Sequence, residues 1–303
     1  MAVTVDSPKL TELIDRESEV VQVATGFMFT EGPLWVPAEG ALHFSDMPGD
    51  KRRSWHPQRG VAVLRDPSNR CVGMSMDSRG AIVVCEHVTS HLVREWPEGR
   101  SEVLASHYGG KELNSPNDVI VANDDSVIFT DPDFGRTVPA VGLERKPELD
   151  FRGVFRVRAE GGEPQLLADD FAEPNGLCFS PDEKILYLVE SRGAPNRKIL
   201  AYDVSPSGDK ISNKRVLIDA GPGTPDGMRC DVDGNLWCGW GMGSAELDGV
   251  MIFAPDGKPI GRIALPERCA NVCFGGLKRD RLFMAASQSI YALYVNTQGA
   301  FGG

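Results

Sequence analysis

Oxygen-bearing side chains recur at matching positions of six similar sequence segments. Five of these positions hold a carboxylate or an amide, and one holds Val72; the five are Glu31, Asn117, Asn175, Asp226 and Asn271. Carboxylate and amide oxygens, with no Cys or His among them, are the hard ligands that Ca²⁺ and Mg²⁺ prefer. If the fold brings these side chains to one point, they predict a site for a single divalent cation.

The segments themselves define an internal repeat. Each consists of a short apolar strand, a polar turn that often holds Asp or Gly, and a second apolar strand, which is typical of a β-hairpin. The repeats begin near residues 31, 72, 117, 175, 226 and 271. A spacing of roughly 40–50 residues suits a four-stranded propeller blade. We therefore predict an all-β, six-bladed β-propeller that forms a single domain over residues 1–303.

The N-terminal segment 20–24 is apolar and precedes the first repeat. Pairing it with the last blade would hide strand edges that would otherwise be exposed. We expect this strand to close the ring.

In a propeller, equivalent positions of all blades lie in a ring around the central channel. We therefore predict Glu31, Asn117, Asn175 and Asp226 as metal ligands at the channel mouth. Asn271 is left out because Ala270, and not proline, precedes it. The alternative is that the Pro-Asn-Gly, Pro-Asn-Asp and Pro-Asp-Gly tripeptides are only turn formers.

Further residues are candidates for contact with a substrate at the mouth. They are Asn117, His87, Asn114 and Asp131, with Asp133 and Lys111 as weaker candidates. For His87 the alternative is a structural role, and for Asp131 a surface turn. The longest insertion, residues 137–151, is a candidate lid.

Composition excludes several classes of protein. The chain has 303 residues, a net charge of -11 and a pI near 5.0, which disfavours binding to nucleic acid. It shows no secretory signal and no apolar run of membrane-spanning length, so we predict a cytoplasmic protein without a membrane segment. The seven cysteines form no CxxC pair, which disfavours a zinc or iron–sulfur cluster and favours buried thiols in a reducing compartment.

Five short motifs carry a resemblance to a known family. They are FTEGPLW (29–35), LNSPNDV (113–119), FTDP (129–132), EPNGL (173–177) and TPDGM (224–228). Together they resemble the family of gluconolactonases, senescence marker protein and luciferin-regenerating enzyme, over roughly residues 25–290. The resemblance implies a six-bladed propeller with Glu31, Asn175 and Asp226 as direct metal ligands, and Asn117 as a ligand or substrate contact. It also implies calcium as the usual metal, with zinc, manganese, magnesium or iron as alternatives.

The expected reaction is hydrolysis of a small lactone, most simply a sugar-derived one, with the metal as Lewis acid. Asp226 is the candidate general base or orienting carboxylate, and the alternative is that it is a ligand only. Two other functions fit the same residues. One is a phosphotriesterase-like hydrolase, and the other is a propeller that serves as a non-catalytic binding platform.

Overall fold

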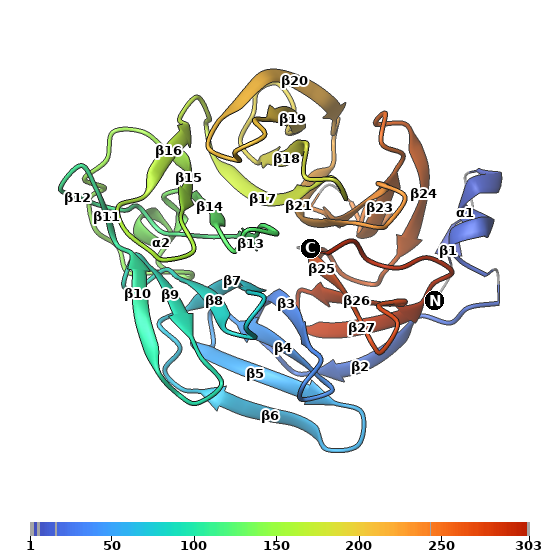
Figure 1. Ribbon diagram of the computed structural model, residues 1–303. Helices are drawn as coiled ribbons and strands as arrows, with labels where there is room; N and C mark the ends of the chain where they lie inside the picture. The colour runs from blue at the N-terminus through green and yellow to red at the C-terminus, as the bar shows by residue number, and fades with distance from the viewer. Residues whose placement is uncertain (1–2, 5–6, 16, 243, 302–303) are drawn as a thin grey trace.

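Six antiparallel sheets surround a central axis in the computed structural model (Figure 1), which describes residues 3–4, 7–15, 17–242 and 244–301. The predicted six-bladed β-propeller is confirmed. Outside the sheets lie two short helices, α1 (Pro8–Leu13) and α2 (Phe134–Thr137), and the hairpin of β11 (His107–Tyr108) and β12 (Lys111–Glu112). No helix among the described residues has the length and apolarity that crossing a bilayer requires.

Four blades are built from strands that are consecutive in sequence. Blade 1 comprises β3 (Thr30–Val36), β4 (Ala41–Asp46), β5 (Lys51–His56) and β6 (Gly60–Arg65). Blade 2 comprises β7 (Cys71–Met76), β8 (Ile82–Glu86), β9 (His91–Glu95) and β10 (Ser101–Ala105). Blade 3 comprises β13 (Val119–Val121), β14 (Val127–Asp131), β15 (Gly153–Val157) and β16 (Gln165–Ala168). Blade 4 comprises β17 (Pro174–Phe179), β18 (Ile185–Glu190), β19 (Lys198–Val204) and β20 (Ile211–Asp219).

The last two blades each take up a strand from the N-terminal region. Blade 5 comprises β21 (Thr224–Cys230), β22 (Leu236–Gly241), β23 (Gly249–Phe253) and β24 (Pro259–Ala264), with β1 (Val3–Thr4) beside β24. Blade 6 comprises β25 (Cys269–Gly275), β26 (Arg281–Ala286), β27 (Ser289–Tyr294) and β2 (Val21–Thr25). Strand β2 pairs antiparallel with β27, so the predicted closure of the ring by an N-terminal strand is confirmed.

The innermost strands β3, β7, β13, β17, β21 and β25 each contact the next around the ring, and β25 contacts β3. All six begin at one end of the channel and finish at the other. We call the end where they begin the mouth face and the opposite end the far face. Because the ring closes on itself, residues at the start of these strands are brought together from the whole length of the chain.

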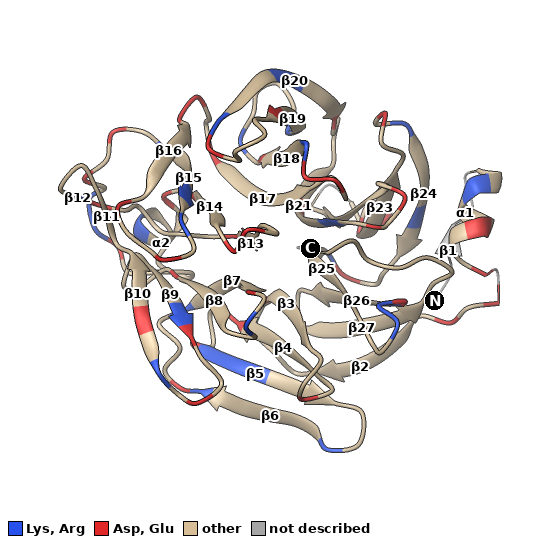
Figure 2. Ribbon diagram, in the orientation of Figure 1, with Lys and Arg blue, Asp and Glu red and all other residues tan. Residues whose placement is uncertain are grey.

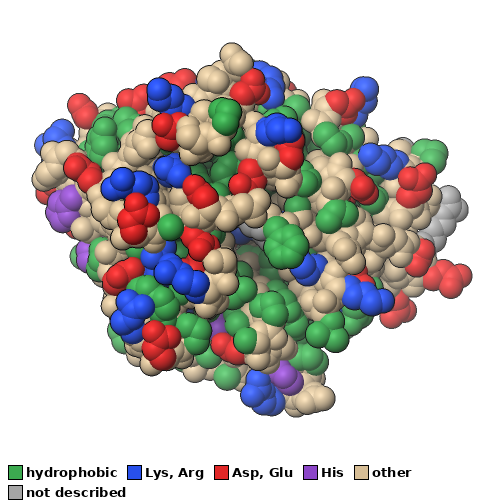
Figure 3. Space-filling view, viewed as in Figure 1, with side chains coloured by type: hydrophobic (Ala, Val, Ile, Leu, Met, Phe, Trp, Pro, Cys, Tyr) green, Lys and Arg blue, Asp and Glu red, His purple; other side chains and the backbone are tan. Residues whose placement is uncertain are grey.

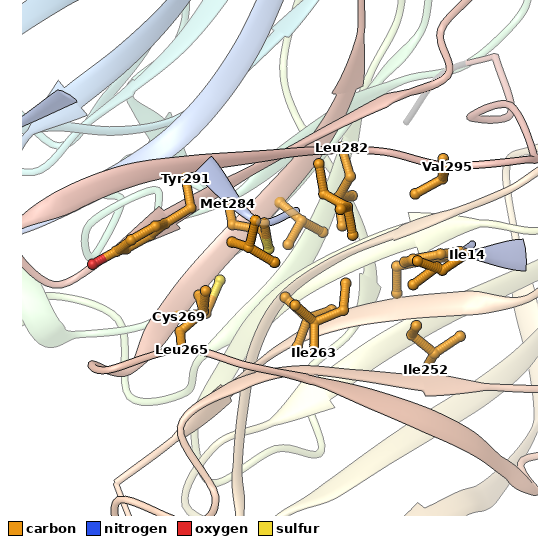
Figure 4. Packing of buried hydrophobic residues seen from close by; sticks show 14 of the residues in the cluster. Ile14, Ile252, Ile263, Leu265, Cys269, Leu282, Met284, Tyr291 and Val295 are labelled. Carbon is orange, nitrogen blue, oxygen red and sulfur yellow. The ribbon is translucent and has the colours of Figure 1, made fainter. Parts of the chain in front are cut away.

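The blades are held together by apolar side chains between neighbouring sheets. Figure 4 shows one such cluster, in which Ile252 and Ile263 of blade 5 face Leu282 and Met284 of blade 6, and Ile14 follows helix α1 into the same core. Fully burying a side chain of this size stabilises the fold by about 1.5–3 kcal/mol. Charged residues lie mainly on connecting loops and on strands farther from the axis, such as β5 and β24 (Figure 2). The rigid interblade packing fixes the positions of the innermost strands.

Candidate active site

A β-bulge lies close to the start of five of the six innermost strands. The register shifts fall between Glu31 and Leu34, Cys71 and Met74, Pro174 and Leu177, Pro225 and Met228, and Cys269 and Asn271. Asn117 lies just before β13, and its backbone N–H donates to the Thr130 carbonyl. A bulge re-aims the side chains of its strand. These irregularities direct the repeated polar residues toward the channel instead of into the interblade cores.

Glycines that follow the polar residues allow the strands to approach closely. A Cβ on Gly176 would lie 2.1 Å from the Asp226 carbonyl oxygen, and one on Gly227 would lie 1.9 Å from Cγ of Asn271. Gly176 lies within strand β17 and Gly227 within strand β21. The interpretation of Pro-Asn-Gly and Pro-Asp-Gly as turn formers is therefore wrong, because these glycines serve strand packing around the axis.

The carboxylate of Glu31 is buried and one of its oxygens is held by two donors. Oε2 accepts the Gly32 amide at 2.7 Å and Nδ2 of Asn271 at 3.0 Å. Burial raises the pKa of Glu31 to about 8, and repulsion from Asp226 and Asp118 adds to the rise. With Oε2 occupied, Oε1 is the atom that Glu31 can offer to a ligand.

Asp226 is likewise buried and held through one oxygen. Oδ2 pairs with Nη2 of Arg268, and the Asn175 side chain donates a hydrogen bond to the same carboxylate. Burial raises the pKa of Asp226, while the Arg268 guanidinium opposes the rise. Two predicted ligands, Asn175 and Asp226, are thus in direct contact.

Asn117 is oriented by His87. Nδ1 of His87 lies 2.9 Å from the Val141 carbonyl oxygen, which can only accept, so Nδ1 carries the proton and Nε2 is an acceptor. Nδ2 of Asn117 approaches that Nε2 at 3.4 Å, which leaves Oδ1 of Asn117 for another ligand. Burial lowers the pKa of His87 to about 4, consistent with a neutral ring. The predicted residue His87 therefore lies beside the site.

Asp118 and Arg268 of the site were not predicted from the sequence, and neither was Arg229, which lies behind Asp118 and lines a different cavity. Asp118 is buried, contacts the Asn271 side chain and lies 3.8 Å from Nη1 of Arg229. Its position directly after Asn117 could have marked Asp118 as a site residue. The direction of its side chain depends on the start of β13 at Val119, which the sequence did not show. The two arginines come from β21 and from the β24–β25 loop, where no motif marks them.

The sequence and the fold of this chain both match known proteins. The SMP-30/Gluconolactonase/LRE-like region matches residues 29–288. A gluconolactonase from Zymomonas mobilis is 32% identical, with the alignment covering 98% of this chain and 87% of the relative. The solved structure of a gluconolactonase from Xanthomonas campestris is 32% identical, with a TM-score of 0.89 and coverage of 97% and 95% of the two chains.

The chain belongs to the SMP-30/gluconolactonase/LRE-like family. The predicted family and the predicted enzyme class, a lactonase, are thereby confirmed. A calcium-binding regucalcin from Agrobacterium tumefaciens shares the propeller, with a TM-score of 0.73 at 20% identity over 99% of this chain and 96% of that one, which is a likeness of fold alone.

The other predicted substrate contacts of this lactonase support the loop before β13. Oδ2 and Oδ1 of Asp131 accept the backbone amides of Asn114 and Ser115, each at 2.8 Å. Nδ2 of Asn114 donates to the carbonyls of Asp131 and Phe151, at 3.2 and 2.9 Å. Both side chains are buried, and their geometry holds the segment that carries Asn117. Contact of either one with a substrate stays a prediction.

The two weaker candidates, Asp133 and Lys111, have no hydrogen bond or ion pair with the four predicted ligands among the described residues. Asp133 is paired with Arg152, and Lys111 is exposed on the β11–β12 hairpin. The insertion 137–151 is fastened to blade 2, because Nη1 of Arg70 donates to the carbonyls of Pro139 and Gly142 at 2.6 and 2.9 Å. Its role as a lid stays a prediction.

The four predicted ligands fit a divalent cation by their chemistry. In addition to burial, Asp226 and Asp118 raise the pKa of Glu31, and Asp118 raises the pKa of Asp226. A cation among these carboxylates would relieve the repulsion between them. Across the described ranges, no three His, Cys, Asp or Glu side chains cluster in a way that could hold a metal by themselves. The candidate centre has two such carboxylates, so amide oxygens must complete it.

Proposed function

We propose that this lactonase depends on one divalent cation, with Ca²⁺ as the preferred ion, and opens a small sugar-derived lactone at the mouth of its channel. Glu31, Asn117, Asn175 and Asp226 would hold the cation. The observation that carries the proposal is that three of the four ligands are already oriented by a neighbour: Asn271 holds Glu31, His87 contacts Asn117, and Arg268 holds Asp226.

A cation bound by these residues would supply a Lewis acid for the lactone carbonyl. The protein contributes the remaining steps. Asp226 accepts a proton from the attacking water, whose oxygen adds to the carbonyl carbon; the ring C–O bond then breaks, and the leaving alkoxide takes up the proton. Arg268 keeps Oδ2 of Asp226 occupied, so that Oδ1 is the oxygen left to hold the cation and to accept the proton of the reacting water.

The mouth also supplies groups that recognise a polar substrate. Asn117 is 7% exposed and His87 is 1% exposed. A substrate hydroxyl would therefore contact the side-chain amide of Asn117 and not the imidazole of His87. Because His87 is fixed in one tautomer by Val141, it acts chiefly by holding the Asn117 amide. We assign Asn117 to metal and substrate together.

Metal depletion followed by reloading tests the proposal. The protein is dialysed against a chelator, and hydrolysis of an aldonolactone is followed at constant pH before and after addition of Ca²⁺. We expect activity to vanish and to return with Ca²⁺, and we expect an organophosphate ester to be turned over at least 100-fold more slowly than the lactone. Full activity in the depleted protein, with no metal detectable by elemental analysis, would exclude metal dependence.

The compartment is part of the same proposal. All seven cysteines are free and buried, which supports a reducing compartment such as the cytoplasm.

A further inference from the structure

A second cavity lies at the far face of the propeller, opposite the candidate active site. Its volume is about 360 Å³. Apolar side chains from the ends of the innermost strands and from the C-terminal segment line it, chiefly Trp35, Met74, Met76, Val121, Phe274 and Phe301. The face seen in Figure 3 is hollowed near its centre, close to the C-terminal mark of Figure 1, and hydrophobic side chains border the hollow.

The guanidinium of Arg229 lies among these apolar walls. Arg229 is 3% exposed, and its Nη1 donates to the carbonyls of Met228 and Leu177 at 2.8 and 3.5 Å. Its other donors, Nε and Nη2, hydrogen-bond to no group in the described part of the chain. The nearest carboxylate, Asp118, is 3.8 Å away, and its Oδ2 makes no hydrogen bond among the described residues. A buried arginine is thus left with unused donors.

The far-face cavity is separate from the mouth. None of Glu31, Asn117, Asn175 and Asp226 lines it. Between the two lie the closely packed strand starts: the Gly73 amide donates to the Asn117 carbonyl at 2.8 Å, and a Cβ on Gly32 would meet the Val72 carbonyl at 1.9 Å. A ligand in the cavity therefore enters from the far face.

Acidic groups at the entrance are already engaged. Asp125 accepts the amide and the hydroxyl of Ser78 at 2.8 and 2.6 Å. Asp77 accepts the amides of Arg79 and Ala81 at 3.0 and 2.9 Å. Arg79 and Arg94 pair with Asp77, at 3.1 and 3.6 Å. An anion that passes the entrance meets an arginine whose Nε and Nη2 are free within the described ranges, while its Nη1 faces Asp118 at 3.8 Å.

We propose that the far-face cavity binds a small monocarboxylate with an apolar body, its carboxylate on Arg229 and its body against Trp35 and Phe274. A desolvated guanidinium forms strong, charge-assisted hydrogen bonds with a carboxylate. Cavities of roughly 300–1,000 Å³ with apolar walls and a few polar groups are typical small-molecule sites.

Calorimetric titration of the full-length, Ca²⁺-saturated protein tests this site. The probes are 3-phenylpropionate and its uncharged analogue 3-phenylpropionamide. We expect the acid to bind once per chain and at least tenfold more tightly than the amide. The same affinity is expected after the metal is removed with chelator, because the cavity lies apart from the ligands; loss of binding on chelation would place the probe at the mouth and overturn the proposal.

Variants locate the bound probe. Arg229→Met is expected to weaken binding of the acid at least tenfold while leaving the amide unchanged. Because Arg229 is buried, Met76→Trp provides a second variant that fills the cavity from its partly exposed edge, and it is expected to abolish binding of both probes. Leu277→Trp, fully exposed in a turn of the same face, is the matched control and should bind as the unmodified protein. Unchanged affinity in Met76→Trp, or equal binding of acid and amide, would overturn the proposal.

Discussion

Nδ2 of Asn271 donates to Oε2 of Glu31 at 3.0 Å, and this bond joins the last blade to the first. Oδ1 of Asn271 in turn accepts its neighbour's amide, that of Val272, at 2.8 Å. Both ends of the amide are therefore committed inside the protein. Asn271 belongs to the repeated column of polar residues, and in the proposed metal centre it would orient Glu31 instead of binding the cation.

Asn271→Ala should weaken the metal site without unfolding the propeller. Removal of a group that orients a metal ligand typically lowers metal affinity by about 10–100-fold. Calcium titration by calorimetry measures the change, and Asn296→Ala, which removes an exposed amide bonded to Asp15, is the control. Equal calcium affinity in both variants would contradict an orienting role.

Asp226→Asn separates the base from the ligand. The variant keeps an oxygen for the metal but cannot accept a proton, so we expect kcat to fall by about 10²–10⁴ at saturating Ca²⁺. Lactone hydrolysis and calcium binding are measured on the same preparation, with Asp256→Asn in an exposed far-face turn as control. Full turnover by the Asp226→Asn variant with metal bound would show that Asp226 is a metal ligand and not the general base.

Gly176→Ala tests the close approach of β17 and β21. The new methyl would lie 2.1 Å from the Asp226 carbonyl oxygen, so the strands must move apart. We expect unfolding to become easier by about 3 kcal/mol, together with weaker calcium binding. Gly26→Ala, at φ +95° with no atom within 4 Å, gives the effect of backbone strain alone, about 1 kcal/mol. Equal free energies of unfolding for the two variants in urea would contradict a close approach of β17 and β21.

Asp131 should make stability depend on pH. Burial raises the pKa of Asp131 to about 7 from an ordinary value of 3.8, so the folded protein holds this proton more tightly than the unfolded chain. The resulting stabilisation is complete below pH 4 and is lost as the pH rises through 7. Between pH 5 and 8, the unfolding free energy should fall by about 1–3 kcal/mol more in the unmodified protein than in Asp131→Asn. Urea unfolding in saturating Ca²⁺ measures both, and parallel pH profiles would contradict the assignment.

The sequence predicted the architecture because local patterning carries it. Six hairpin-like repeats at blade spacing specify six sheets, and an apolar N-terminal segment without a partner specifies closure through β2. The column of Glu31, Asn175 and Asp226 was predicted for the same reason, since equivalent positions in a closed ring face one axis, and its role in metal binding stays a prediction. Within that column, Ala270 in place of a proline was the feature of the sequence that set Asn271 apart from the other Asn and Asp residues.

Other parts of the site depend on contacts between residues far apart in the chain. Arg268 and Arg229 carry no motif, and their contacts with Asp226 and Asp118 arise only where blades meet. Asp131 was expected near the mouth, but its oxygens are bonded to backbone amides that the loop brings to it.

What the sequence determined by itself is therefore the repeat and the closed ring, because these follow from periodicity along the chain; the oxygen ligands stay a prediction from the same column. The tertiary structure decided which oxygen of each carboxylate is free and which side chains hold the others. It also decided that the channel is divided by closely packed glycines into a mouth and a far-face cavity. Those features depend on bulges and on approaches of a few ångströms between strands, and distances across the ring leave no periodic signal in the sequence.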